Sequence, residues 1–128
     1  VHHPIFVTEF GETAFVVRSD GCIVAYLFGF FVPGGECFYI HLVAVRSDKR
    51  RGGFAALLYD HVEALCLANG AVWIKAITPP TNATSLKFHA KRGFEITGSE
   101  TINGVRFVPN YSGEGRHMSV LLKSLADR

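Results

Sequence analysis

A cluster of basic side chains beside two glycines is the part of the sequence best suited to chemistry. It consists of Arg46, Lys49, Arg50, Arg51, Gly52 and Gly53. The apolar run before it, residues 39–45, is typical of a strand, and the segment from about Gly53 to Asn69 repeats apolar side chains at helical spacing. A helix that begins at such a turn directs unpaired backbone N–H groups and the positive end of its dipole toward a ligand. The pattern therefore predicts a site for phosphate or pyrophosphate.

The spacing within this turn excludes two common phosphate-binding motifs. A P-loop would need Gly-Lys-Ser or Gly-Lys-Thr after its glycines, and a dinucleotide-binding turn would need G-x-G-x-x-G. Residues 50–55, Arg-Arg-Gly-Gly-Phe-Ala, contain neither. They resemble the Arg/Gln-x-x-Gly-x-Gly/Ala signature of the GNAT superfamily of N-acetyltransferases. A basic turn that joins a strand to a helix by chance is the alternative.

A second motif lies at residues 82–94, NATSLKFHAKRGF. On a helix, Asn82, Ser85 and His89 share one face, because they stand at i, i+3 and i+7. A solvated polar face is the simplest interpretation of three such residues. The string nevertheless resembles the GNAT pattern Asn-x-x-Ala/Ser-x-x-Phe/Leu-Tyr-x-x-x-Gly-Phe at every marked position but one. The departure is His89, where the family most often has tyrosine.

The resemblance covers about Phe15 to Leu122, and it implies an α/β (α+β) fold. Such a fold has a mixed, mostly antiparallel sheet flanked by helices, with strands 39–45 and 71–77 parallel and splayed around acetyl-coenzyme A. The order of predicted elements agrees with it. Strands over residues 13–18, 22–32 and 37–45 form an antiparallel meander, and a helix then crosses over to strand 71–77. Because residues 22–32 are continuously apolar, we expect that strand to be buried on both faces.

The beginning of the chain is short for this family. GNAT proteins usually have a strand and one or two helices before the meander, and residues 1–10 cannot hold them. We therefore expect one acetyltransferase domain, residues 1–128, that is short at its N-terminal end or is a fragment.

The resemblance also implies which residues hold acetyl-coenzyme A. Backbone groups of strand 39–45 would hold the pantetheine arm, the turn would surround the pyrophosphate, and the second motif would add polar contacts. The residues concerned are Val43, Ala44, Val45, Arg50, Arg51, Gly52, Gly53, Phe54, Ala55, Ala56, Asn82, Ser85 and His89.

The implied reaction is transfer of the acetyl group of acetyl-coenzyme A to a primary amine, by direct attack in a ternary complex. The amine could belong to a small molecule or to a protein. Two alternatives stay open at this point: transfer of a longer acyl group, and a binding module that keeps the coenzyme contacts as a sensor without turnover.

His41 is the candidate base that would take the proton from the amine. A strict alternation along the strand would place Tyr39, His41, Val43 and Val45 on one face, beside the thioester. Histidine is the residue type that titrates near neutral pH. Residues 40–45, IHLVAV, also resemble the strand of arylalkylamine acetyltransferases in which a histidine serves in a proton wire. A half-buried structural histidine is the alternative, and Glu36 acting through water is the next candidate base.

His89 is the candidate acid that would protonate the leaving thiolate. It stands where the family's tyrosine has this role, and an imidazolium can also donate a proton. The substitution could equally mean that no acid is needed, since a thiol with a reference pKa of about 8.5 leaves readily.

Composition limits the compartment and the partners. The net charge of +2 is too small to indicate nucleic acid, and no apolar run reaches the length of a membrane span. Three widely spaced cysteines in apolar sequence, Cys22, Cys37 and Cys66, predict reduced core thiols in a cytoplasmic protein without a metal site. The expected partners are acetyl-coenzyme A and an unidentified amine, and the resemblance adds homodimerisation as an option. Phenylalanines such as Phe28 and Phe30 are expected to be core residues.

Overall fold

The structure is a computed structural model that describes residues 6–9, 13–50 and 52–125. The chain divides into two compact units, Val1–Ala71 and Val72–Arg128. None of the helices in the described ranges has the length and apolar character needed to cross a membrane.

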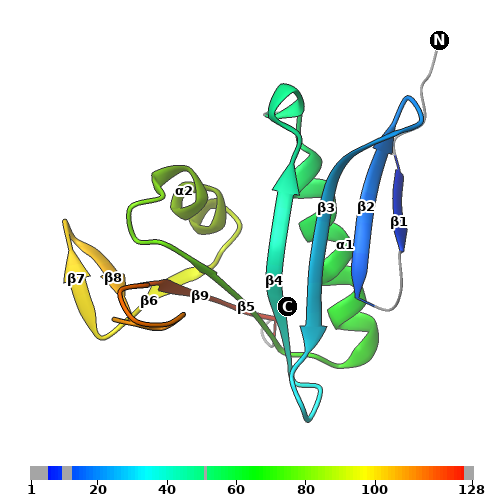
Figure 1. The fold of residues 1–128 in the computed structure, drawn as a ribbon. Coiled ribbons are helices and arrows are strands. Elements are labelled where there is room, and N and C mark those ends of the chain that lie inside the picture. The colour runs from blue at the N-terminus through cyan, green and yellow to red at the C-terminus, as the bar shows by residue number, and fades with distance from the viewer. Residues whose placement is uncertain (1–5, 10–12, 51, 126–128) are drawn as a thin grey trace. The chain divides into compact units, whose positions relative to one another are not determined.

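The first unit contains an antiparallel meander followed by a helix (Figure 1). Its strands are β1 (Phe6–Glu9), β2 (Ala14–Ser19), β3 (Cys22–Phe31) and β4 (Cys37–Val45), and each strand pairs with the next. A short 3₁₀ helix, η1 (Ser47–Lys49), precedes α1 (Phe54–Asn69). The predicted meander and helix are confirmed, whereas β1 carries no sequence pattern that predicts it.

Helix α1 covers one face of β2, β3 and β4, and the core of the unit lies between them. On the helix, the buried side chains are Phe54, Leu58, Tyr59, Val62 and Cys66. On the strands, they include Phe15, Val17, Leu27, Phe38 and Ile40. Burial raises the pKa of the Cys66 thiol to about 12, so this cysteine is an inert core residue, as predicted.

The prediction that residues 22–32 are buried on both faces is wrong. Burial alternates along most of β3, and the three aromatic side chains at even positions are between 42% and 44% exposed: Tyr26, Phe28 and Phe30. The reason is that α1 covers only the face to which Ala25, Leu27 and Gly29 belong. Cys22, at the start of the strand, is also exposed and is not a core thiol.

A β-bulge interrupts the pairing of β3 with β4. Leu42 pairs with Phe28, but the next residue of β3, Gly29, pairs with Ile40, which leaves His41 as the extra residue. The strands approach closely here. A Cβ atom at Gly29 would overlap the carbonyl oxygen of Tyr39 and lie 2.6 Å from the ring of Phe38. Only glycine fits at this position, so Gly29 permits the bulge that displays His41.

The second unit begins with β5 (Trp73–Thr78) and α2 (Ala83–Lys91), which were both predicted. Three strands form its sheet, because β5 and β6 (Glu95–Thr97) both pair antiparallel with β9 (Ser119–Ser124). A hairpin of β7 (Glu100–Ile102) and β8 (Val105–Phe107) turns at Asn103 and Gly104, both with positive φ. The parallel pairing of strands 39–45 and 71–77 stays a prediction.

We expect the Gly29→Ala variant to lose about 1–3 kcal/mol of unfolding free energy, because its new methyl group overpacks the strand pair. Denaturant unfolding measures this loss. The control is Cys22→Ala at the exposed start of the same strand, which should change the free energy by less than about 0.5 kcal/mol. Equal unfolding free energies of the two variants would contradict this prediction, because they would show that β3 and β4 can move apart at the bulge and accommodate the methyl group without cost.

Candidate functional site

The basic turn after β4 is the first component of the site. The backbone N–H of Arg46 donates to the carbonyl of Val24 on β3 (2.8 Å), which anchors the turn to the sheet. The Arg46 guanidinium donates two hydrogen bonds to the carboxylate of Asp48, at 2.6 and 2.9 Å. These bonds hold the pKa of Asp48 below its usual range. Arg46 is therefore already engaged, and Lys49 and Arg50 are the other described cations of the turn.

The two glycines after the turn shape the beginning of α1. Gly53 precedes the helix in the left-handed conformation, with φ of 80°. A Cβ atom at Gly52 would lie 2.8 Å from the ring of Phe54, so this position also favours glycine. No side chain in the described part of the chain caps α1, and its first turn has no acidic residue. The free N–H groups at this end suit a phosphate oxygen. Arg51 lies outside the described residues.

His41 extends from the bulge on the side of β4 that faces away from α1. Its ring lies edge-on to Phe28 with centroids 6.0 Å apart, and its centroid is 5.9 Å from that of Tyr39. The side chain is exposed. The candidate base is therefore accessible and borders a row of aromatic rings.

The predicted single face of Tyr39, His41, Val43 and Val45 is wrong. Val43 and Val45 pair with Leu27 and Ala25, which face α1, whereas Tyr39 pairs with Phe30 on the other face. The bulge changes the alternation because it adds one residue. Val43, Ala44 and Val45 lie beyond the bulge, and their backbone contact with pantetheine stays a prediction.

On α2, the three polar residues of the second motif form a connected group. The Asn82 side chain caps the helix by accepting a hydrogen bond from the backbone N–H of Ser85 at 3.1 Å. The Ser85 hydroxyl lies 3.3 Å from His89 Nδ1. The predicted shared face of Asn82, Ser85 and His89 is confirmed. On this face, Asn82 caps the helix and the Ser85 hydroxyl lies beside the ring of His89. Their contact with coenzyme stays a prediction.

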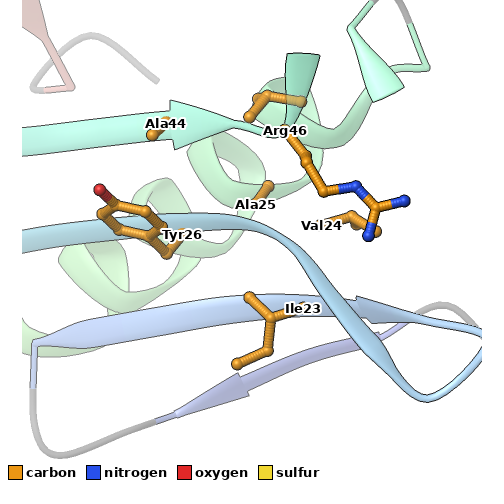
Figure 2. A pocket seen from close by; sticks show the side chains of 7 residues that line it. Ile23, Val24, Ala25, Tyr26, Ala44 and Arg46 are labelled. Carbon is orange, nitrogen blue, oxygen red and sulfur yellow. The ribbon is translucent and has the colours of Figure 1, made fainter. Parts of the chain in front are cut away.

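A shallow pocket of about 250 Å³ lies near the carboxyl end of β4 (Figure 2). Its walls come from β3 and β4, where Tyr26 pairs with Ala44, and Arg46 closes one end. The lining is mainly apolar: Ile23, Val24, Ala25, Tyr26, Ala44, Val45 and Arg46. The pocket therefore suits an apolar group better than a strongly solvated one.

The sequence model of the Acetyltransferase (GNAT) family matches residues 3–94, which is more than half of the chain. The chain belongs to the GNAT acetyltransferase family. No curated protein matches it. Solved structures show the same α+β fold.

Three of these structures illustrate the range of sequence identity and TM-score. The match to Ard1 from Thermoplasma volcanium has 23% identity and a TM-score of 0.76, covering 91% of this chain and 73% of that one. The Arabidopsis thaliana Naa50 complex with a bisubstrate analogue, CoA-Ac-MVNAL, has 24% identity and a TM-score of 0.71, with coverages of 87% and 72%. An aminoglycoside 6'-N-acetyltransferase complexed with coenzyme A has 16% identity and a TM-score of 0.70, with coverages of 90% and 73%.

The surroundings of His89 favour one protonation state of its ring. Its Nδ1 lies 2.7 Å from the carbonyl oxygen of Ser85, which can only accept, so Nδ1 carries a hydrogen. The residue is buried, with 5% of its surface exposed. Burial lowers the pKa of His89, Arg92 lowers it further, and the hydrogen bond to Ser85 opposes them. These conditions favour the neutral ring, with the lone pair on Nε2. The acid role of His89 stays a prediction.

Sequence reasoning missed two features of the site in this GNAT chain. The first is the Arg46–Asp48 pair, which the close spacing of the two charges in Arg-Ser-Asp could have indicated. The second is the exposed aromatic row of β3, which the alternation of aromatic with aliphatic or glycine residues in Tyr26-Leu27-Phe28-Gly29-Phe30 could have indicated.

We expect His89 to make the unfolding free energy decrease as the pH becomes acidic. Its pKa is lowered in the folded state, so the unfolded chain binds the proton more readily. The contribution is present above the ordinary histidine pKa of about 6.5 and is lost as the pH falls below it. Denaturant unfolding from pH 7.5 to 5 should show a shallower pH dependence in His89→Leu than in the parent.

His41→Gln is the matched control, because His41 is exposed. It should keep the pH dependence of the parent. The same dependence in parent and His89→Leu would contradict this assignment.

Proposed function

We propose that this GNAT chain is an N-acetyltransferase that moves the acetyl group of acetyl-coenzyme A to a primary amine by direct attack in a ternary complex. The observation that carries the proposal is the uncapped beginning of α1 behind Gly52 and Gly53, with Lys49 and Arg50 beside it. The family's cosubstrate, acetyl-coenzyme A, contains a pyrophosphate, and this is the anion that the arrangement suits. The acetyltransferase complexed with coenzyme A has the same fold.

Turnover requires a group that takes a proton. A primary alkylamine has a reference pKa of about 10.4 and is mostly protonated at neutral pH. His41 is exposed at the bulge and can accept that proton, directly or through one water. The free amine then attacks the thioester carbonyl, the C–N bond forms and the C–S bond breaks. The attacking nitrogen loses one proton as the amide forms, and the departing coenzyme thiolate takes up a proton and leaves as the thiol, so that the protons balance.

The backbone of β4 beyond the bulge also has a role in the proposed reaction. We assign the backbone N–H of Val43 to the thioester oxygen, where negative charge develops during the attack. The turn, from Arg50 to Ala56, is assigned to the pyrophosphate. Asn82, Ser85 and His89 remain candidates for further contacts with the coenzyme.

Saturating acetyl-coenzyme A should raise the thermal unfolding midpoint by several degrees. A concentration of a hundred times Kd adds about 2.7 kcal/mol to the unfolding free energy. Arg50→Ala should weaken binding by about three- to tenfold, because it removes one exposed charge from the turn. Titration calorimetry measures both affinities.

Arg116→Ala is the matched control, since it removes an exposed arginine from a distant position in the sequence. It should keep the parental affinity. An equal affinity of Arg50→Ala would remove Arg50 from the site, and no thermal shift in the parent would overturn the cosubstrate.

His41→Gln should lower kcat by about 10²- to 10⁴-fold, the usual contribution of a general base, and leave the affinity for acetyl-coenzyme A near normal. Release of coenzyme A with an accepted amine gives kcat, and calorimetry gives the affinity. Glu36→Gln is the companion variant, because Glu36 in the β3–β4 connection is the alternative base. Parental turnover in His41→Gln together with a large loss in Glu36→Gln would transfer the role to Glu36.

A further inference from the structure

The connection between β8 and β9 is closed by hydrogen bonds that converge on one asparagine. It consists of residues 108–118, and we call it the β8–β9 loop. Asn110 has φ of 58°, a left-handed conformation that is uncommon for residues other than glycine. Its side-chain Oδ1 accepts a hydrogen bond from the backbone N–H of Gly115 at 2.8 Å, and its carbonyl oxygen accepts one from that of Gly113 at 3.2 Å. The loop is therefore folded back onto Asn110.

The third hydrogen bond of Asn110 depends on a histidine. The backbone N–H of Asn110 donates to Nδ1 of His117 at 3.0 Å. Nδ1 accepts only while it keeps its lone pair, so the closed loop requires a neutral ring with the hydrogen on Nε2. A protonated ring has N–H groups at both nitrogens, and two donors would then face each other. His117 is exposed, so a proton reaches this bond without any opening of the core.

The other neighbours of His117 do not compete for Nδ1. Its ring lies beside that of Phe107 on β8, with the centroids 5.4 Å apart. The other titratable or charged side chains of β5, β7, β8 and the loop are Lys75, Glu100, Arg106, Tyr111, Glu114 and Arg116. Among the residues that the structure describes, none of these forms an ion pair or a hydrogen bond with His117. The charge on its ring therefore acts on the loop through Asn110.

The closed loop also places an aromatic ring on the sheet of the second unit. Lys75 of β5 has its Nζ over the ring of Tyr111, 5.1 Å from the ring centroid. Tyr111 directly follows Asn110, so the left-handed backbone of Asn110 sets the direction in which the chain reaches Tyr111. A change in the backbone of Asn110 therefore moves the ring that covers Lys75.

We propose that the β8–β9 loop is an acid-sensitive switch, in which protonation of His117 breaks its hydrogen bond with Asn110, opens the loop and releases Tyr111 from Lys75. The step adds one proton to Nδ1 and breaks no covalent bond. Because only the neutral ring accepts, the loop is closed at the alkaline end of the range between about pH 5 and 8 in which histidine ordinarily titrates, and it opens as the pH falls. This inference does not depend on the proposed function.

Amide hydrogen exchange, followed by solvent-exchange NMR on the whole chain at pH 7.5 and 5.5, tests the switch. After correction for the intrinsic effect of pH on exchange, the protection factors of the Asn110 and Gly115 amides should be at least about fivefold lower at pH 5.5. This is the change that the loss of one ordinary hydrogen bond produces. The ring-current shift of the Lys75 side chain should decrease over the same interval.

The internal control is the amide of Gly35 in the β3–β4 connection. It donates at 2.9 Å to the carbonyl oxygen of Val32, which does not titrate. Its protection factor should be the same at both pH values.

Two variants of His117 separate the acceptor from the charge. His117→Asn keeps an acceptor, because its Oδ1 is two bonds from Cβ as Nδ1 is, and it does not titrate. Its loop should be closed at both pH values, with the protection factors of the parent at pH 7.5. His117→Phe keeps a ring beside Phe107 but has no acceptor, so its loop should be open at both pH values, with the protection factors of the parent at pH 5.5.

The remaining outcomes each contradict part of the switch. Equal protection of the parent at pH 7.5 and 5.5 would overturn it. A loss confined to the Asn110 amide, with Gly115 unchanged, would also overturn it, since the ring would then turn away while the loop stayed closed. The pH dependence of the parent in His117→Asn would assign the acid sensitivity to a group other than His117. An unchanged Lys75 shift would overturn the release of Tyr111.

Discussion

The close approach of β3 and β4 at Gly29 is the constraint on which the candidate site depends. A side chain at this position would overlap the backbone of Tyr39. Because none is there, β4 can hold one residue more than β3 and the extra residue is His41. The same insertion decides which later residues of β4 face α1. One missing methyl group thus positions both the candidate base and the strand segment that follows it.

Local patterns predicted most of the elements. The bounds of β4 agree with the predicted strand, and α1 ends at Asn69, the predicted last residue of the helical segment, with Gly70 in the left-handed conformation. Asn82 caps α2 because a short side chain at that position can reach the N–H of Ser85. These features depend on residues within one turn of each other, and a single sequence contains that information.

The features that were missed depend on distant parts of the chain. The bulge results from contact between Gly29 and Tyr39, and a sequence pattern within either strand does not reveal it. The exposure of Phe28 depends on which faces of the sheet α1 covers, and a continuous apolar run suits one or two covered faces equally. Strand β1 pairs with β2 through its backbone, which its weak side-chain pattern could not indicate. For these reasons, the residue types of the site were easier to predict than their orientation.

The pair that Arg46 forms with Asp48 has a consequence for how quickly an anion reaches the turn. Opposite charges 2.6 Å apart form a compact dipole, whose field declines with distance faster than that of a lone cation. An incoming polyanion therefore meets a weaker long-range attraction than the number of arginines and lysines in the turn suggests. The rate constant of encounter is therefore expected to depend on ionic strength less steeply than it would if Arg46 were a lone cation.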